Sequence, residues 1–288
     1  MSDAVVRRGG KIVVKRANSA TYWLRSVLLL LALLTVYGFF TIDTRGSDMR
    51  EAVRETLEYL RIMFTTPRPV PRHFGVTDGG GFWPTLLVAM REVGVTLALA
   101  FLTTLIGAVV ALVGGLLAAR NLTNARVSNT IKGVIAFIRA VPTVLWVLIF
   151  AIGAGLGSVA AIIGMSFHTF GYLIKAYSES FEELDEGVIE ALRASGATWL
   201  QIVFQAVLPS SMSYILSWTF IRFEINFAVA VAMGAAAGAG GIGFNLFMAA
   251  GYFFDIREIG FITLLILAVA IVMEIIATQL KKRYHIHE

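Results

Sequence analysis

The chain has 288 residues, of which 57% are apolar and only 15% charged, with a mean hydropathy of +0.77. Soluble globular domains carry roughly 25% charged residues. The composition therefore argues against a soluble enzyme, a nucleic-acid binder or a disordered protein, despite the net charge of +5. Zero cysteines exclude disulfides, thiolate metal sites and a cysteine nucleophile, and four histidines do not favour a histidine metal site. The sequence predicts an all-α membrane protein that crosses the bilayer several times.

Six segments are apolar and long enough to cross a membrane, which takes about 20 residues. The predicted spans are 26–42, 93–119, 131–153, 158–177, 211–233 and 259–280. The first span follows a tail, 1–25, and is not followed by a small-residue cleavage site. The last span precedes a short tail, 281–288. The core membrane domain is predicted over 93–280.

The segment 43–92 between the first two spans is predicted to be an external loop. Within it, apolar residues recur every three to four positions and charged residues lie between them. This spacing predicts an amphipathic helix at the membrane surface, followed by a connector rich in proline and glycine. The apolar positions are Met49, Val53, Leu57, Leu60 and Phe64.

The distribution of basic residues predicts the orientation. With the N-terminus inside, the inner segments 1–25, 120–132, 179–210 and 281–288 carry 13 Lys and Arg, whereas the outer segments 43–82 and 250–258 carry 7. Cytoplasmic loops carry the excess of basic residues. Both termini are therefore expected in the cytoplasm.

The cytoplasmic segment 179–210 is too polar at its start to cross a membrane. Residues with helical spacing precede Gly196, and a second helical stretch runs over 197–207 before Pro209. Glycine adopts positive φ without steric cost, and proline ends helices. The pattern predicts helix, sharp turn, helix, a rigid element that can transmit a push. The alternative is a re-entrant connection that only packs against the bundle.

This segment resembles the EAA motif of the membrane subunits of ABC importers, a family with a type I permease fold. The positions that match are Glu190, Ala191, Gly196, Leu208 and Pro209, and Arg193 between them is a further candidate for coupling. The resemblance implies that they form a coupling loop that docks on an ATPase subunit. It also implies two ATPase subunits, a second permease subunit (identical or closely related) and an extracytoplasmic binding protein.

Further pieces resemble phosphonate- and phosphite-type ABC transporter permeases. They are His168–Gly171, Arg193–Ala197, Arg222–Glu224 with Asn226, and Gly238–Gly243. This resemblance implies import of a phosphonate or a related phosphorus oxyanion across the bacterial cytoplasmic membrane. The chain has no Walker A motif, so no cofactor is expected on it, and ATP and Mg²⁺ are expected on the partner ATPase subunits.

Arg222 and Glu224 lie inside the fifth predicted span, where a charge is costly and must face protein or a water-filled path. Arg222 and Asn226, four residues apart, share a helix face, whereas Arg222 and Glu224 do not. We hypothesise that Arg222 presents positive potential to a passing oxyanion while Glu224 braces a neighbouring helix. The alternative is a pair of structural salt bridges between helices.

Arg139 and His168 are weaker candidates for the translocation path. Arg139 precedes Pro142 near the cytoplasmic end of the third span, where an arginine that reaches back to the membrane surface is the simpler explanation. His168 lies in an apolar run and is more simply an interior hydrogen-bonding residue.

The glycines of 238–243 spell G-x-G-x-x-G but continue an apolar membrane segment, so the nucleotide-binding interpretation is rejected. Glycine-rich backbone at membrane depth lines a cavity or packs closely on protein. The glycines that could line the path are Gly238, Gly240, Gly241 and Gly243.

Two other kinds of transporter compete with the importer interpretation. An ion-coupled secondary carrier needs a repeated half and ionisable groups in broken helices, and a channel needs a filter-like constriction. Neither explains a structured cytoplasmic loop. An enzyme would need a catalytic cluster, and none is evident in the sequence.

Overall fold

The computed structural model describes residues 5–8, 11–14, 19–41, 48–77 and 80–283. It divides into two compact units, Met1–Glu58 and Tyr59–Glu288. Residues 1–4, 9–10 and 15–18 of the predicted tail 1–25 and the last five residues of the predicted tail 281–288 lie outside the described residues.

The first unit contains a two-stranded antiparallel sheet and a long apolar helix. Strand β1 (Val5–Arg8) pairs with β2 (Lys11–Val14), and α1 covers Ser19–Thr41. Helix α1 contains the first predicted span but begins at Ser19 rather than at residue 26. None of its residues is buried, so its apolar surface is available to lipid.

Helix α2 (Met49–Thr65) confirms the predicted amphipathic helix. The five apolar residues of its stripe are all exposed. After α2, the connector contains a short 3-10 helix, η1 (Pro71–Phe74), and is tied to the start of the last helix. The Arg68 amide donates to the Arg257 carbonyl at 3.1 Å, and His73 pairs with the buried Glu258.

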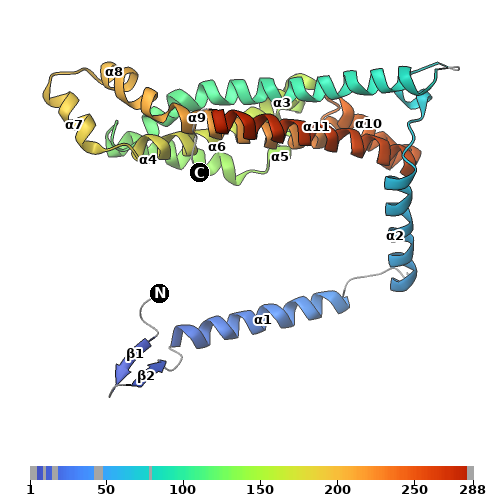
Figure 1. The fold of residues 1–288 in the computed structure, drawn as a ribbon, viewed down its shortest axis with the longest axis horizontal. Helices are drawn as coiled ribbons and strands as arrows, with labels where there is room; N and C mark the ends of the chain where they lie inside the picture. Colours follow the sequence, from blue (N-terminus) through green and yellow to red (C-terminus); the bar gives the residue numbers. More distant parts are fainter. Residues whose placement is uncertain (1–4, 9–10, 15–18, 42–47, 78–79, 284–288) are drawn as a thin grey trace. The chain divides into compact units, whose positions relative to one another are not determined.

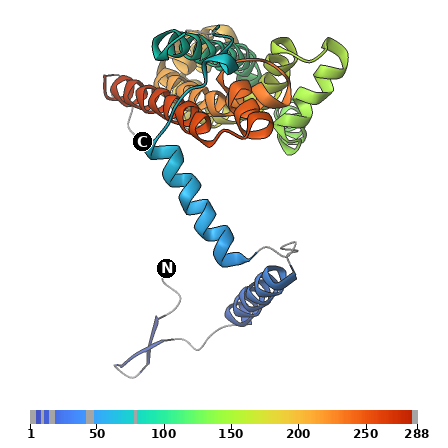
Figure 2. The same ribbon diagram turned by 90° about the vertical axis from the view of Figure 1, so that its right-hand side faces the viewer.

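Long helices packed side by side build the second unit (Figures 1 and 2). Helix α3 lies along α6 over much of its length, and α9 packs against both. Five helices of the described chain are long and apolar enough to cross a membrane, or six spans result if α4 and α5 count as one bent span. The bundle helices are α3 (Phe82–Ala118), α4 (Ala125–Ala140), α5 (Thr143–Ala154), α6 (Ser158–Glu182), α9 (Leu208–Ala236), α10 (Ile242–Met248) and α11 (Ile256–Arg283).

Helix α3 begins at Phe82, so residues 82–92 of the predicted external segment are helical and continuous with the second predicted span. Pro84 stands in the first turn, where proline is tolerated because that amide has no helical partner. Thr85, Ala89 and Val93 are buried at a spacing of four and continue one packed face of the helix. The charges of Arg91 and Glu92 lower the local hydropathy, and for this reason the second predicted span begins only at residue 93.

The third predicted span, 131–153, is not one continuous helix. Helices α4 and α5 meet at an angle of 88°. Val141 has an extended backbone (φ −85°, ψ 124°), as expected of a residue before proline, and Pro142 precedes the first residue of α5. The proline therefore breaks this span rather than bending it gently.

The predicted helix, turn, helix over 179–210 is confirmed. Helix α7 (Glu186–Ala194) is followed by a turn at Gly196 and by α8 (Trp199–Ile202). Pro209 does not end the second helix, contrary to the prediction. A π-helical turn, η2 (Val203–Val207), leads from α8 into α9, and its wider backbone accommodates a proline that lacks an amide proton.

A short helical segment connects α9 to α11. A glycine-rich loop leads into α10, a π-helical turn η3 (Ala249–Phe253) follows, and α11 begins at Ile256, three residues before the predicted sixth span. Asp255 accepts hydrogen bonds from the Arg257 and Glu258 amides at 3.0 and 3.1 Å and so caps α11.

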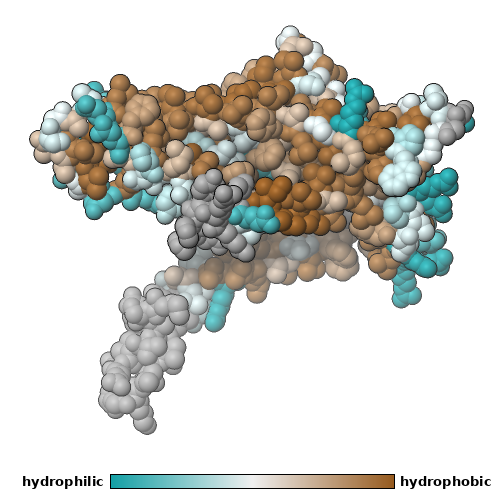
Figure 3. All heavy atoms as spheres, turned by 45° about the horizontal axis from the view of Figure 1, so that its top comes forward, coloured by the Kyte–Doolittle hydropathy of each residue, from teal (hydrophilic) through white to brown (hydrophobic). Residues whose placement is uncertain are grey.

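The surface of the second unit is mostly apolar. Figure 3 shows brown, hydrophobic residues along the bundle in this view. Large exposed apolar side chains include Leu105, Val109 and Val113 on α3 and Ile271 and Ile275 on α11. A surface of this kind suits lipid rather than water.

Candidate translocation site and coupling loop

Arg222 is buried in the middle of α9, with 3% of its surface exposed. Its Nη2 lies 3.0 Å from Nδ1 of His168, and Nε and Nη2 donate to the Thr169 hydroxyl at 3.4 and 3.3 Å. The guanidinium carbon lies 5.3 Å from the centre of the Tyr172 ring, a cation–π contact. Because Arg222 can only donate, Nδ1 of His168 must accept and the imidazole is neutral in this arrangement.

Asn226 lies one turn further along α9 and is completely buried. Its Oδ1 accepts from the Thr169 hydroxyl at 3.1 Å, and its Nδ2 donates to the Thr104 hydroxyl of α3 at 2.8 Å. Arg222 and Asn226 therefore share a helix face, as predicted. We call His168, Thr169, Tyr172, Arg222 and Asn226 the Arg222 cluster.

The Arg222 cluster holds a positive charge among neutral groups. An arginine at the centre of a membrane helix costs about 2.5–3.5 kcal/mol on insertion scales, so its donors need partners. In the described part of the chain, those partners are an imidazole, a hydroxyl and an aromatic ring rather than a carboxylate. The site thus keeps a positive potential inside the bundle, which favours an anion.

Close packing of α3 on α6 fixes the position of Thr169. A Cβ added at Gly107 of α3 would collide with the Thr169 side chain. A larger residue at 107 would therefore push the two helices apart and displace the hydroxyl that Arg222 and Asn226 share.

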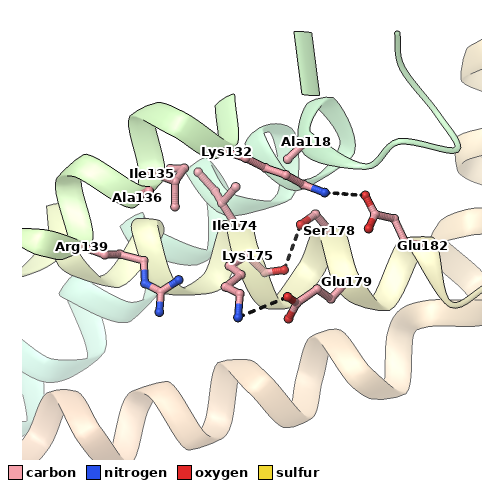
Figure 4. Close-up of a pocket in the computed structure, with 10 residues that line it drawn as sticks. All are labelled: Ala118, Lys132, Ile135, Ala136, Arg139, Ile174, Lys175, Ser178, Glu179 and Glu182. Carbon is pink, nitrogen blue, oxygen red and sulfur yellow. Dashed lines mark hydrogen bonds and ion pairs between the residues drawn. The ribbon is translucent and has the colours of Figure 1, made fainter. Parts of the chain in front are cut away.

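Glu224 and Arg139 lie outside the Arg222 cluster. Glu224 is partly buried two residues from Arg222, on a different face of α9. Arg139 stands exposed in the last turn of α4. It lines a cavity between α4 and α6 that Figure 4 shows, together with Lys132, Lys175 and two glutamates.

The glycine-rich loop packs tightly against protein. Gly238, Gly240 and Gly241 have φ of 60°, 77° and 75°, a region that favours glycine. The Ile242 amide donates to the Thr96 hydroxyl of α3 at 3.0 Å. A Cβ at Gly243 would collide with the Val231 carbonyl of α9. Gly241 and Gly243 are buried by this packing.

The turn of the coupling loop has the geometry of a glycine-terminated helix. Gly196 has φ of 84°, its amide donates to the Arg193 carbonyl, and the Ala197 amide donates to the Leu192 carbonyl, each at 3.0 Å. Thr198 then caps α8: its hydroxyl accepts from the Gln201 amide, and the Gln201 side chain accepts from the Thr198 amide, which is a capping box. These hydrogen bonds fix the end of α7 and the start of α8 on either side of the turn.

Two side chains hold the coupling loop to the bundle. Arg193 Nη2 donates to the Asn121 carbonyl at 2.7 Å, and the Trp199 indole donates to the Leu122 carbonyl at 3.0 Å. Asn121 in turn donates to the Phe181 carbonyl at the end of α6 at 2.7 Å. These bonds join α7 and α8 to the connection between α3 and α4 and, through Asn121, to the end of α6. Glu190 and Ala191 remain exposed beside Arg193.

Residues 111–286 match the family described as "Binding-protein-dependent transport system inner membrane component". The chain belongs to this family. The matched region contains the coupling loop, α6 and α9, and thus every residue of the Arg222 cluster.

Curated relatives of this inner membrane component carry names of phosphorus-compound transport. The chain is 33% identical over 190 residues to the phosphite transport system permease protein PtxC of Stutzerimonas stutzeri. The match covers 66% of this chain and 68% of that protein. The chain is 33% identical over 153 residues to the phosphate-import permease protein PhnE of Mycolicibacterium smegmatis, covering 53% of this chain but only 29% of that protein. The match thus spans under a third of the second relative's length.

Solved structures share the fold of this inner membrane component. An inward-facing form of the MetNI methionine ABC transporter aligns with a TM-score of 0.64 at 23% identity, covering 69% of this chain and 97% of that chain. A bacterial ABC transporter involved in alginate import aligns with a TM-score of 0.59 at 16% identity. The alignment covers 90% of this chain and 96% of that chain. These likenesses establish the type I importer permease fold.

Several residues of the inner membrane component were not recognised as site residues in the sequence. Tyr172 belongs to the Arg222 cluster, Thr104 bonds to its Asn226, and Asn121 and Trp199 anchor the coupling loop. Hydroxyl, aromatic and amide residues are common in membrane helices and their short connections. Only their three-dimensional contacts with Arg222 and with the loop distinguish them.

Proposed function

We propose that the chain is the membrane-spanning subunit of an ATP-driven ABC importer that moves a phosphonate or a related phosphorus oxyanion across the cytoplasmic membrane. The observation that carries the proposal is the buried Arg222, which has neutral partners on α6. A cation held this way attracts an anion of modest size. The names of the relatives, which transport phosphite and phosphate, support this class of cargo.

The family and the coupling loop support the partners that we propose. Two ATPase subunits, which bind ATP and Mg²⁺, dock on the loops around Glu190–Pro209 of two permease subunits, and an extracytoplasmic binding protein delivers the cargo. The second permease subunit is an identical copy or a close relative. We expect ATP and Mg²⁺ on the partner ATPase subunits and no cofactor on this chain. The excess of Lys and Arg in the segments on the loop's side supports an orientation with both termini in the cytoplasm.

The coupling loop supports a mechanical role. Closure of the ATPase pair on ATP pushes both loops together, and the bonds of Arg193 and Trp199 carry the movement to α3 and α6. The path turns from inward- to outward-facing, and hydrolysis resets it. A loop with sharply capped helices moves as a rigid body, which this transmission requires.

The test is ATP hydrolysis by the reconstituted complex with and without binding protein loaded with methylphosphonate. Loaded binding protein is expected to stimulate hydrolysis several-fold, and Gly196→Pro is expected to abolish the stimulation while the complex still assembles. Gly133→Ala, on the exposed surface of α4 with no atom near the added Cβ, is the control. Stimulation that is unchanged in Gly196→Pro would contradict the coupling role.

A further inference from the structure

A row of three nitrogen-bearing side chains, those of His168, Arg139 and Lys175, continues from the Arg222 cluster along α6. His168 contacts Arg222, and Lys175 lies seven residues further along α6, on the same face. Between them, the stem of Arg139 packs on the backbone at Gly171, where an added Cβ would lie 3.2 Å from Arg139 Cγ. Seven residues of helix span about 10 Å, so neighbouring members of the row are about one helical turn apart along α6.

The row ends in the cavity between α4 and α6. Figure 4 shows the charged ends of Arg139 and Lys175 on the same side of α6. The lining also includes Lys132, Glu179 and Glu182. Glu182 is the last residue of α6, and α7 of the coupling loop begins four residues later. The cavity therefore lies between the Arg222 cluster and the end of the bundle that carries the coupling loop.

The charges in this cavity are only partly compensated. Lys132 pairs with Glu182 at 2.8 Å, and Lys175 pairs with Glu179 at 3.2 Å. Arg139 makes no ion pair with any carboxylate in the described residues. The Lys175–Glu179 pair is more than half exposed on both sides, and exposed pairs are stabilised by at most about 1 kcal/mol. Lys175 can therefore exchange Glu179 for another anion at little cost.

We propose that Arg139 and Lys175 form an exit station, a second and weaker binding place for the anionic cargo between the Arg222 cluster and the cytoplasm. The proposal rests on the proposed function, because it takes the cargo to be a phosphorus oxyanion. Passage requires binding that is favourable enough to enter and weak enough to leave, spread over more than one place. Arg139 supplies the attraction, and the glutamates beside Lys132 and Lys175 keep it weak.

The first experiment separates transport from coupling. In proteoliposomes that contain the whole complex, Arg139→Gln combined with Lys175→Gln is expected to lower the maximal rate of methylphosphonate uptake about tenfold. ATP hydrolysis stimulated by loaded binding protein is expected to stay within twofold of the parent, because neither residue touches the coupling loop. Arg139→Lys combined with native Lys175 is expected to recover most of the uptake, and Arg126→Gln, an exposed arginine on the same helix, is the matched control.

The second experiment reads the local potential directly and needs no turnover. Since the chain has no cysteine, Lys175→Cys is the single thiol on this subunit in the purified complex. The rates of labelling by an anionic and a cationic methanethiosulfonate are compared. Adding Arg139→Gln is expected to lower the anionic-to-cationic rate ratio several-fold, whereas adding Arg126→Gln leaves it unchanged.

Each experiment has a result that overturns the exit station. In the first experiment, uptake by the Arg139→Gln, Lys175→Gln variant that equals the parent's overturns the exit station. A fall in uptake matched by an equal fall in stimulated ATP hydrolysis also overturns it. A labelling ratio that does not respond to Arg139→Gln also overturns it. A parent complex that loaded binding protein fails to stimulate contradicts the proposed function itself, which is a separate and recognisable outcome.

Discussion

Arg222 and Asn226, one helical turn apart on α9, are joined through a single hydroxyl, that of Thr169 on α6. Arg222 donates to this oxygen, whose single proton is shared between Asn226 Oδ1 at 3.1 Å and the Met165 carbonyl at 2.8 Å. The oxygen thus orients the guanidinium and links it to α3 through Asn226 and Thr104. Three helices must keep their mutual positions for the charge to stay in place.

Replacing Arg222 with Met removes the charge and keeps much of the side-chain length. A hydrogen bond to a charged group contributes about 1.5–3 kcal/mol, so uptake of methylphosphonate is expected to fall by roughly one to two orders of magnitude. Arg222→Lys is expected to retain part of the activity. Unchanged uptake by Arg222→Met in a complex that assembles normally would remove Arg222 from the path.

Thr104→Val tests the link between α3 and α9. The substitution leaves Nδ2 of the buried Asn226 without its acceptor, which costs about 1–3 kcal/mol of folding free energy. The melting temperature of the detergent-solubilised complex is expected to fall by several degrees. Thr130→Val, on the exposed side of α4, is expected to leave it unchanged; equal melting temperatures for both variants would show that the bond is unimportant.

Gly196→Ala tests the turn of the coupling loop. No atom lies within 4 Å of a Cβ added there, so only the positive φ opposes alanine, at a cost of about 1–2 kcal/mol. Stimulated ATP hydrolysis is expected to fall several-fold, with Gly196→Asn less affected because asparagine tolerates this region. If Ala and Asn variants behaved alike and like the parent, the turn geometry would not govern coupling.

Gly243→Ala and Gly238→Ala distinguish packing from backbone conformation in the glycine-rich loop. The Cβ at 243 would collide with the Val231 carbonyl, whereas at 238 the nearest atom is Leu156 Cβ at 3.9 Å. Gly243→Ala is expected to lower the amount of folded complex strongly, and Gly238→Ala only mildly. Size-exclusion chromatography of the solubilised complex measures this, and the reverse order would contradict the packing.

Much of the fold could be predicted from the sequence because apolar length and helical spacing are local properties. The amphipathic helix at Met49–Thr65 and the turn at Gly196 depended on such patterns and are confirmed. Helix ends were less predictable. Arg91 and Glu92 masked the start of α3, and a π-helical turn allowed the backbone to continue past Pro209.

The candidate site could be predicted only in part. Arg222 and Asn226 were recognisable, since a charge and an amide at a spacing of four stand out in an apolar helix. Their partners Thr169, Tyr172 and Thr104 were not, because their role depends on how α3 and α6 pack against α9. Lys175 of the exit station was missed for the same reason. The roles in transport of all the path candidates stay predictions: Arg139, His168, Arg222, Glu224, Asn226, Gly238, Gly240, Gly241 and Gly243.

The most direct test of the central claim is accumulation of radiolabelled methylphosphonate in proteoliposomes that contain this chain, its ATPase and its binding protein. The account predicts accumulation that requires both ATP and the binding protein and that Arg222→Met strongly reduces. Accumulation by the chain alone, driven by an ion gradient without nucleotide, would contradict the account and favour a secondary carrier.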